Sequence, residues 1–134
     1  MGRRALTTPA TALAVLAVTA SLSGCASDED GPARGTAERF YQAVLSGQGN
    51  AACALLAPRT AEQMRSDGED CGRSITGMGL RGGNVLASQV WGGEAQVRMT
   101  GDTLFLHRFP QGWLVRAAGC TPRGDRPYDC QVGG

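Results

Sequence analysis

Four cysteines between positions 53 and 130 of this 134-residue chain have a spacing that suits disulfides better than a metal site. No two of them show the close Cys-x-x-Cys spacing of zinc sites, and His107 is the only histidine. Four cysteines allow three pairings. We favour nearest-neighbour pairing, Cys53 with Cys71 and Cys120 with Cys130, because each pair then lies within one local structural unit. The residues thus predict two disulfides, no metal and no other cofactor.

A fifth cysteine, Cys25, follows a short apolar leader. Arg3 and Arg4 give the leader a positive start, and Ala12 to Val18 is apolar but too short to span a bilayer, which takes about 20 residues. The segment Leu22-Ser23-Gly24-Cys25 resembles the lipobox of bacterial lipoproteins, whose cysteine receives lipid. This resemblance implies a signal peptide over residues 1–24, lipid such as palmitate on Cys25, and anchoring at the outer face of the cell membrane. The alternative is an ordinary secretory signal with a chance cysteine, and the export route stays open.

The charge of the chain excludes some classes of partner. Loss of Arg3 and Arg4 with the leader would leave eleven of the thirteen basic residues, all arginine, against twelve acidic residues, a net charge of −1. A nearly neutral domain has no electrostatic footprint for nucleic acid or for an anionic lipid surface. The absence of lysine, beside abundant glycine and alanine, is typical of a GC-rich genome such as an actinobacterial one.

The elements that carry these residues divide the mature chain in two. Residues 25–32 are predicted to form a short acidic tether, and residues 33–134 a single small domain. The domain should open with an amphipathic helix that stops at Gly47. The apolar positions that recur with helical spacing are Ala37, Phe40, Tyr41, Val44 and Leu45.

Shorter helical segments should follow this first helix. Asn50 is predicted to cap a second helix over residues 51–57. Thr60 and Gln63 have the spacing of a capping box for one or two further turns. Residues 71–78 indicate only a partly buried turn or helix.

After Gly83 the period of the pattern changes to two, which is typical of strands. Links of two or three turn-forming residues separate the segments, so consecutive strands should pair antiparallel as a four-stranded meander. Helices followed by strands give an α+β fold, with the helices packed on one face of a curved sheet. The predicted strands are residues 85–91, 95–100, 103–109 and 113–118.

Two short motifs carry no function in our interpretation. Gly77 to Gly82 spells G-x-G-x-x-G, but a dinucleotide site needs a strand before this motif and a helix after it. Arg123-Gly124-Asp125 spells the integrin-binding tripeptide. Its neighbours Pro122 and Pro127 predict a solvated turn instead.

Four segments resemble parts of small actinobacterial lipoproteins: Ala37–Ala43, Ala52–Pro58, Asp102–Leu106 and Gly112–Val115. The domain of those proteins is similar to the nuclear transport factor two-like (cystatin-like cone) fold. The resemblance implies helices seated in the concavity of a bent antiparallel sheet. Isomerases, cyclases and non-enzymatic binding domains all use that fold, so it does not by itself give a function.

If the first helix fills the concavity, only a small pocket can remain there. We expect that pocket near Tyr41, with Trp91, His107 and Trp113 as the other candidate side chains, and without an acid–base pair. No catalytic residue is assigned. These expectations favour a non-enzymatic lipoprotein that binds a small apolar ligand or an envelope protein. The alternatives are a structural accessory to another membrane protein and an isomerase-like or cyclase-like enzyme.

Overall fold

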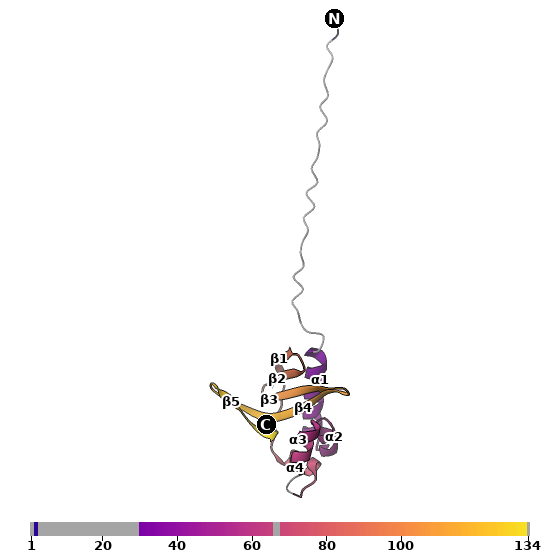
Figure 1. The fold of residues 1–134 in the computed structure, drawn as a ribbon, viewed down its shortest axis with the longest axis vertical. Coiled ribbons are helices and arrows are strands. Elements are labelled where there is room, and N and C mark those ends of the chain that lie inside the picture. The colour runs from indigo at the N-terminus through magenta and orange to yellow at the C-terminus, as the bar shows by residue number, and fades with distance from the viewer. Residues whose placement is uncertain (1, 3–29, 66–67, 134) are drawn as a thin grey trace.

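The computed structural model describes residue 2, residues 30–65 and residues 68–133, in which helices come first and strands second (Figure 1). The predicted α+β class is confirmed, whereas Cys25 and the leader lie outside the described residues. Within the described part, no helix is long and apolar enough to cross a membrane. The helices are α1 (Asp30–Leu45), α2 (Gly49–Ala54), α3 (Pro58–Gln63) and α4 (Cys71–Gly77). The strands are β1 (Val85–Trp91), β2 (Glu94–Met99), β3 (Thr103–Phe109), β4 (Gly112–Arg123) and β5 (Arg126–Gly133).

Helix α1 buries the face that its periodicity predicts. Phe40, Tyr41 and Val44 lie in the core, whereas Leu45 at the end of the helix is exposed. The helix ends as expected before Gly47, which has a φ of +71° that few other residues adopt. It begins at Asp30, so the last three residues of the predicted tether are helical.

The two capping signals that we predicted for the short helices are wrong. Helix α2 starts at Gly49, one residue before Asn50, and its N-cap makes no side-chain hydrogen bond. Gly49 contacts the backbone of Gly72 in α4 so closely that a side chain would not fit. Helix α3 begins at Pro58, whose fixed φ suits the first helical position, so Thr60 lies inside the helix rather than at its cap.

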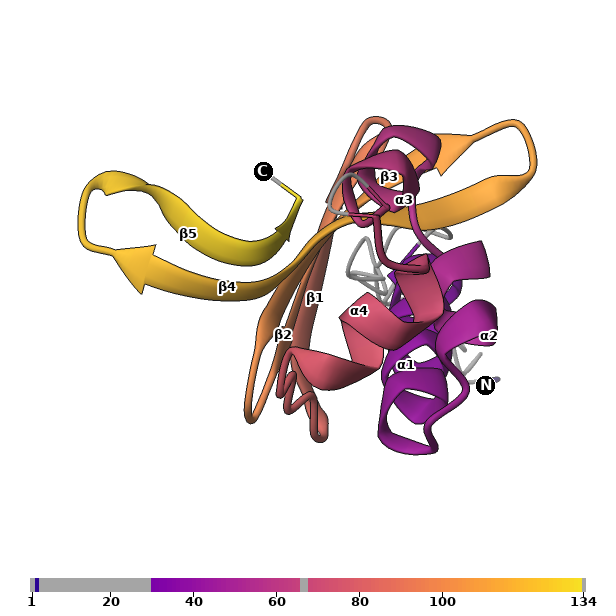
Figure 2. The same cartoon turned by 90° about the horizontal axis from the view of Figure 1, so that it is seen from below.

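The sheet has five antiparallel strands in the order β1-β2-β3-β4-β5, one more than predicted. The four expected strands are present in the expected order, but β4 continues to Arg123 and turns through Gly124 and Asp125 into β5. This turn is exposed, as predicted. Strand β5 was not predicted, because Pro127 is unfavourable in most strands. An edge strand such as β5 tolerates proline. Figure 2 shows the β4–β5 hairpin projecting away from the helices.

One hydrophobic core joins the helices to one face of the sheet. Alternate residues of β2, β3 and β4, among them Val97, Leu104, Leu106 and Val115, are fully buried in the same cluster as the apolar side of α1. Both disulfides have the nearest-neighbour pairing: Cys53–Cys71 joins α2 to α4, and Cys120–Cys130 joins β4 to β5. The helix-covered face is therefore packed.

Candidate functional site

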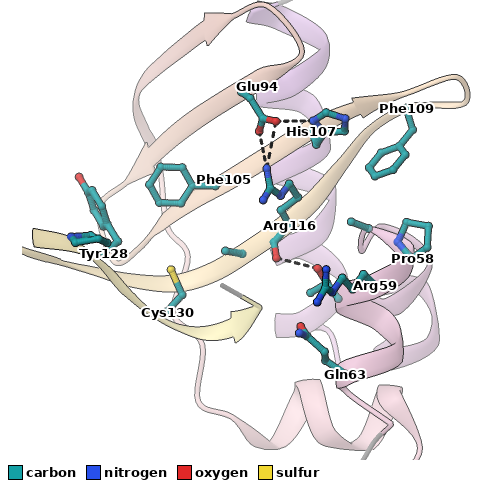
Figure 3. Close-up of a pocket in the computed structure, with 14 residues that line it drawn as sticks. Pro58, Arg59, Gln63, Glu94, Phe105, His107, Phe109, Arg116, Tyr128 and Cys130 are labelled. Carbon is teal, nitrogen blue, oxygen red and sulfur yellow. Dashed lines mark hydrogen bonds and ion pairs between the residues drawn. The ribbon is translucent and has the colours of Figure 1, made fainter.

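A cavity of about 810 Å³ lies on the opposite face of the sheet, away from α1. Figure 3 shows the residues that line it in front of the sheet and α1 behind. Strand β3 explains why this second face is apolar, because Phe105 and Phe109 alternate with the buried Leu104 and Leu106. The strand therefore presents large side chains on both faces.

Tyr128 on β5 closes the cavity from the side of the projecting hairpin. Its ring meets the ring of Phe105 edge-on, with the centroids 5.0 Å apart. Its hydroxyl accepts a hydrogen bond from Nε2 of Gln96 on β2 at 3.3 Å. The fifth strand thus brings an aromatic side chain across to the outer faces of β2 and β3.

A β-bulge in β4 supplies a charged side chain to the same face. Phe105 pairs with Ala117, but the next residue, Leu106, pairs with Val115, so Arg116 is the extra residue. Both Arg116 and Ala117 line the cavity, which strict alternation along a strand would forbid. The bulge therefore directs the arginine toward the cavity.

Arg116, Glu94 and His107 form a charged cluster at the cavity. Nδ1 of His107 lies 2.6 Å from Oε1 of Glu94, because the two residues face each other across β2 and β3. Nη1 of Arg116 donates to both carboxylate oxygens of Glu94, at 3.2 and 3.1 Å. When the imidazole is neutral and carries its proton on Nδ1, Nε2 is left as an acceptor. This arrangement is a histidine oriented by a carboxylate.

Helix α3 forms the opposing wall. Leu56 makes a parallel bridge to Val115 at the edge of β4, and α3 begins two residues later at Pro58. Within the helix, the hydroxyl of Thr60 donates to the backbone carbonyl of Arg116 at 2.9 Å. These contacts fix the short helix beside the bulge.

No family model, curated protein or solved structure matches this chain. The site must therefore be interpreted from its geometry alone. In residues 30–65 and 68–133, no three side chains of His, Cys, Asp or Glu are grouped so as to hold a metal ion. The groups at the cavity that could contact a ligand are aromatic rings and a few charged side chains.

The four side chains expected to form a pocket do not come together. His107 lines the cavity, but Tyr41 (2% exposed) and Trp113 (5% exposed) belong to the core on the other face. Trp91 is 52% exposed at the end of β1. In the part of the chain that the structure describes, side chains of α1 fill the helix-covered face where the pocket was expected.

Glu94 and His107 form a carboxylate–histidine pair at this cavity, whereas the expected absence of an acid–base pair referred to a pocket near Tyr41. Sequence reasoning missed Arg116, which a bulge directs to the cavity, and Tyr128, which the fifth strand brings to it. One signal was present in the sequence. The apolar residues on both sides of β3 indicated that neither face of this strand is simply solvated.

Proposed function

We propose that this chain is an extracytoplasmic lipoprotein, anchored through lipid on Cys25, whose domain binds a small and mostly apolar ligand. The two disulfides indicate a domain outside the cytoplasm, because such bonds persist in oxidising compartments. The lipobox-like Leu22-Ser23-Gly24-Cys25 supports the anchor. The observation that carries the binding function is the cavity on the open face of the sheet.

The size and lining of this cavity fit a small-molecule site. Its volume of about 810 Å³ lies within the range of roughly 300–1,000 Å³ that is typical of ligand pockets. Phe105, Phe109 and Tyr128 offer aromatic surface, and the Glu94–Arg116 pair adds a polar group that can orient a ligand. A purely structural accessory has no need of such a cavity, so binding is the better proposal.

The cone-like fold is part of the same proposal. Helices that precede the sheet and cover one of its faces support a relationship to the nuclear transport factor two-like domains. In this chain the ligand would lie on the face away from α1, between the sheet and α3. A pocket beneath the helices would compete with the core for the same volume.

Binding should depend on Phe105. The neutral fluorophore N-phenyl-1-naphthylamine should brighten on binding to the purified domain. Phe105→Ala should weaken its affinity about tenfold, because a truncated ring no longer shields apolar ligand surface. Fluorescence titration measures this effect. Trp91→Ala is the matched control, since it removes an exposed aromatic ring that does not line the cavity. Absence of a signal, or equal loss in both variants, would contradict the binding proposal.

The Glu94–His107 pair favours a second candidate function, an acid–base enzyme of the isomerase or cyclase kind. Glu94 would hold the imidazole in one tautomer, so that Nε2 could take a proton from a bound substrate. A base of this kind acts on a substrate that is already bound beside it. The aromatic side chains that line the cavity would provide the binding surface.

A substrate screen separates the two functions. If the domain only binds, a panel of hydrolase, isomerase and cyclase substrates should show no turnover above background. Turnover that disappears in His107→Ala, while circular dichroism and thermal unfolding stay unchanged, would establish the enzyme instead. Tyr41→Phe is uninformative in this test, because Tyr41 lies in the core away from the cavity.

A further inference from the structure

The charges at the cavity do not cancel. Among the described residues, two arginines, Arg59 and Arg116, line it together with a single acidic side chain, Glu94. Both oxygens of Glu94 are engaged, by Arg116 and by His107, so its negative charge is balanced within the protein. A cationic ligand would find no unengaged carboxylate there. With His107 neutral, the cavity keeps one unbalanced positive charge.

That charge belongs to Arg59 on α3. In the described parts of the chain, 30–65 and 68–133, no side chain forms a hydrogen bond or ion pair with it. Arg116 adds further donors, because its bonds to Glu94 use Nη1 and leave out Nε and Nη2. Figure 3 shows Arg59 and Arg116 on α3 and β4, both at the same cavity. The polar part of the cavity is therefore rich in N–H donors.

We infer that the ligand is an amphiphile with an acidic head group, a carboxylate or a phosphate. Its apolar body would lie against Phe105, Phe109 and Tyr128, and its head group would accept hydrogen bonds from Arg59, with Arg116 beside it. Guanidinium groups bind carboxylate and phosphate oxygens through paired N–H bonds. This inference rests on the proposed binding function and adds the chemistry of the ligand to it.

Competition experiments with matched twelve-carbon compounds test the inference. Dodecanoate, dodecyl phosphate, dodecanol and dodecylamine differ only in the head group, and each can displace bound N-phenyl-1-naphthylamine. Dodecanoate or dodecyl phosphate should bind about tenfold more tightly than dodecanol, which corresponds to one partly exposed charge-assisted hydrogen-bonded contact. Dodecylamine should bind least well. The order of the two acidic compounds identifies a carboxylate or a phosphate as the natural head group.

Variants of Arg59 test whether this arginine causes the preference for an acidic head group. Arg59→Gln should lower the affinity for the preferred acidic compound about tenfold. It should lower the affinity for dodecanol twofold or less. Arg59→Lys should restore part of the preference for the acidic compound over dodecanol. Arg65→Gln, in the segment after α3, removes an exposed arginine outside the cavity and should change neither affinity. Equal affinities of the acid and the alcohol for the unmodified protein would overturn the inference while leaving apolar binding intact. Failure of the fluorophore itself to bind would instead overturn the proposed function.

Discussion

Asp102→Ala should lower the free energy of unfolding at pH 7 by about 2–4 kcal/mol, because three backbone N–H groups lose their acceptor. Oδ1 of Asp102 accepts from Thr103 at 2.6 Å and from Cys120 at 2.8 Å, and Oδ2 accepts from Gly119 at 2.8 Å. These bonds tie the loop between β2 and β3 to β4. A loss of this size is a large fraction of the roughly 5–15 kcal/mol that stabilises a typical domain.

The effect of Asp102 should also depend on pH. Burial raises the pKa of Asp102 above its ordinary value of 3.8 and outweighs the backbone hydrogen bonds to Gly119, Thr103 and Cys120, which lower it. The folded protein therefore binds this proton more tightly than the unfolded chain, so stability falls as the pH rises through the raised pKa. The stability gap between the unmodified protein and Asp102→Ala should be fully present below about pH 3.8 and should narrow as the pH rises through the raised pKa.

Urea denaturation at a series of pH values measures both effects. Asp129→Ala is the matched control, because this carboxylate is exposed on β5 and lies 3.9 Å from Arg123 in a long ion pair. The control should change stability by less than about 0.5 kcal/mol. A gap that widens as the pH rises from acid would show that the bonds to the charged form dominate over burial.

The sequence predicts the order of the elements well, because periodicity directly reports which residues face a core. The change of period after Gly83 separates helices from strands, and Gly47 marks the end of α1. Short helices were harder to predict. In α2 and α3 the positions are set by close contact with α4 and by pairing with β4, and local capping signals at Asn50 and Thr60 are overridden.

The charged cluster shows why the site was not predicted. A two-residue turn at Gly101 and Asp102 would place His107 opposite Gln96. In the structure the N–H of Met99 donates to the carbonyl of Asp102 at 2.7 Å, so these two residues pair and the turn lies at Thr100 and Gly101, one residue earlier. The register therefore moves by two residues and His107 faces Glu94. A pair that depends on a register of this kind cannot be found from alternation alone, which survives a shift of two.

The position of the cavity was not predicted from the sequence for a similar reason. The apolar faces of β3 indicate two covered sides, but only the structure shows what covers the second one. The bulge at Arg116 and the strand that carries Tyr128 have no strong local signature, since one is a slip in pairing and the other contains Pro127. Both the bulge and strand β5 are set by pairing with neighbouring strands. The site consequently lies on the face that sequence reasoning left unassigned.

Cys25→Ala should abolish membrane retention of the mature protein. The thiol of Cys25 is the group in the lipobox-like segment that would take up diacylglycerol. One lipid chain gives only marginal membrane binding, so stable anchoring needs the two chains of a diacylglycerol. In a lipoprotein-processing bacterial host, the variant should remain as an unprocessed precursor or be released.

Fractionation, intact mass and labelled palmitate incorporation measure this outcome together. The unmodified protein should sediment with membranes, begin at Cys25 and carry the mass of its lipid. Ser23→Ala is the matched control, because it exchanges one small residue for another next to the cleavage site and should leave processing intact. Membrane retention and cleavage that persist unchanged in Cys25→Ala would eliminate the anchor. The domain would then be held at the membrane by something other than lipid on Cys25, and the proposed binding function would still stand, because the disulfides and the cavity do not depend on the lipid.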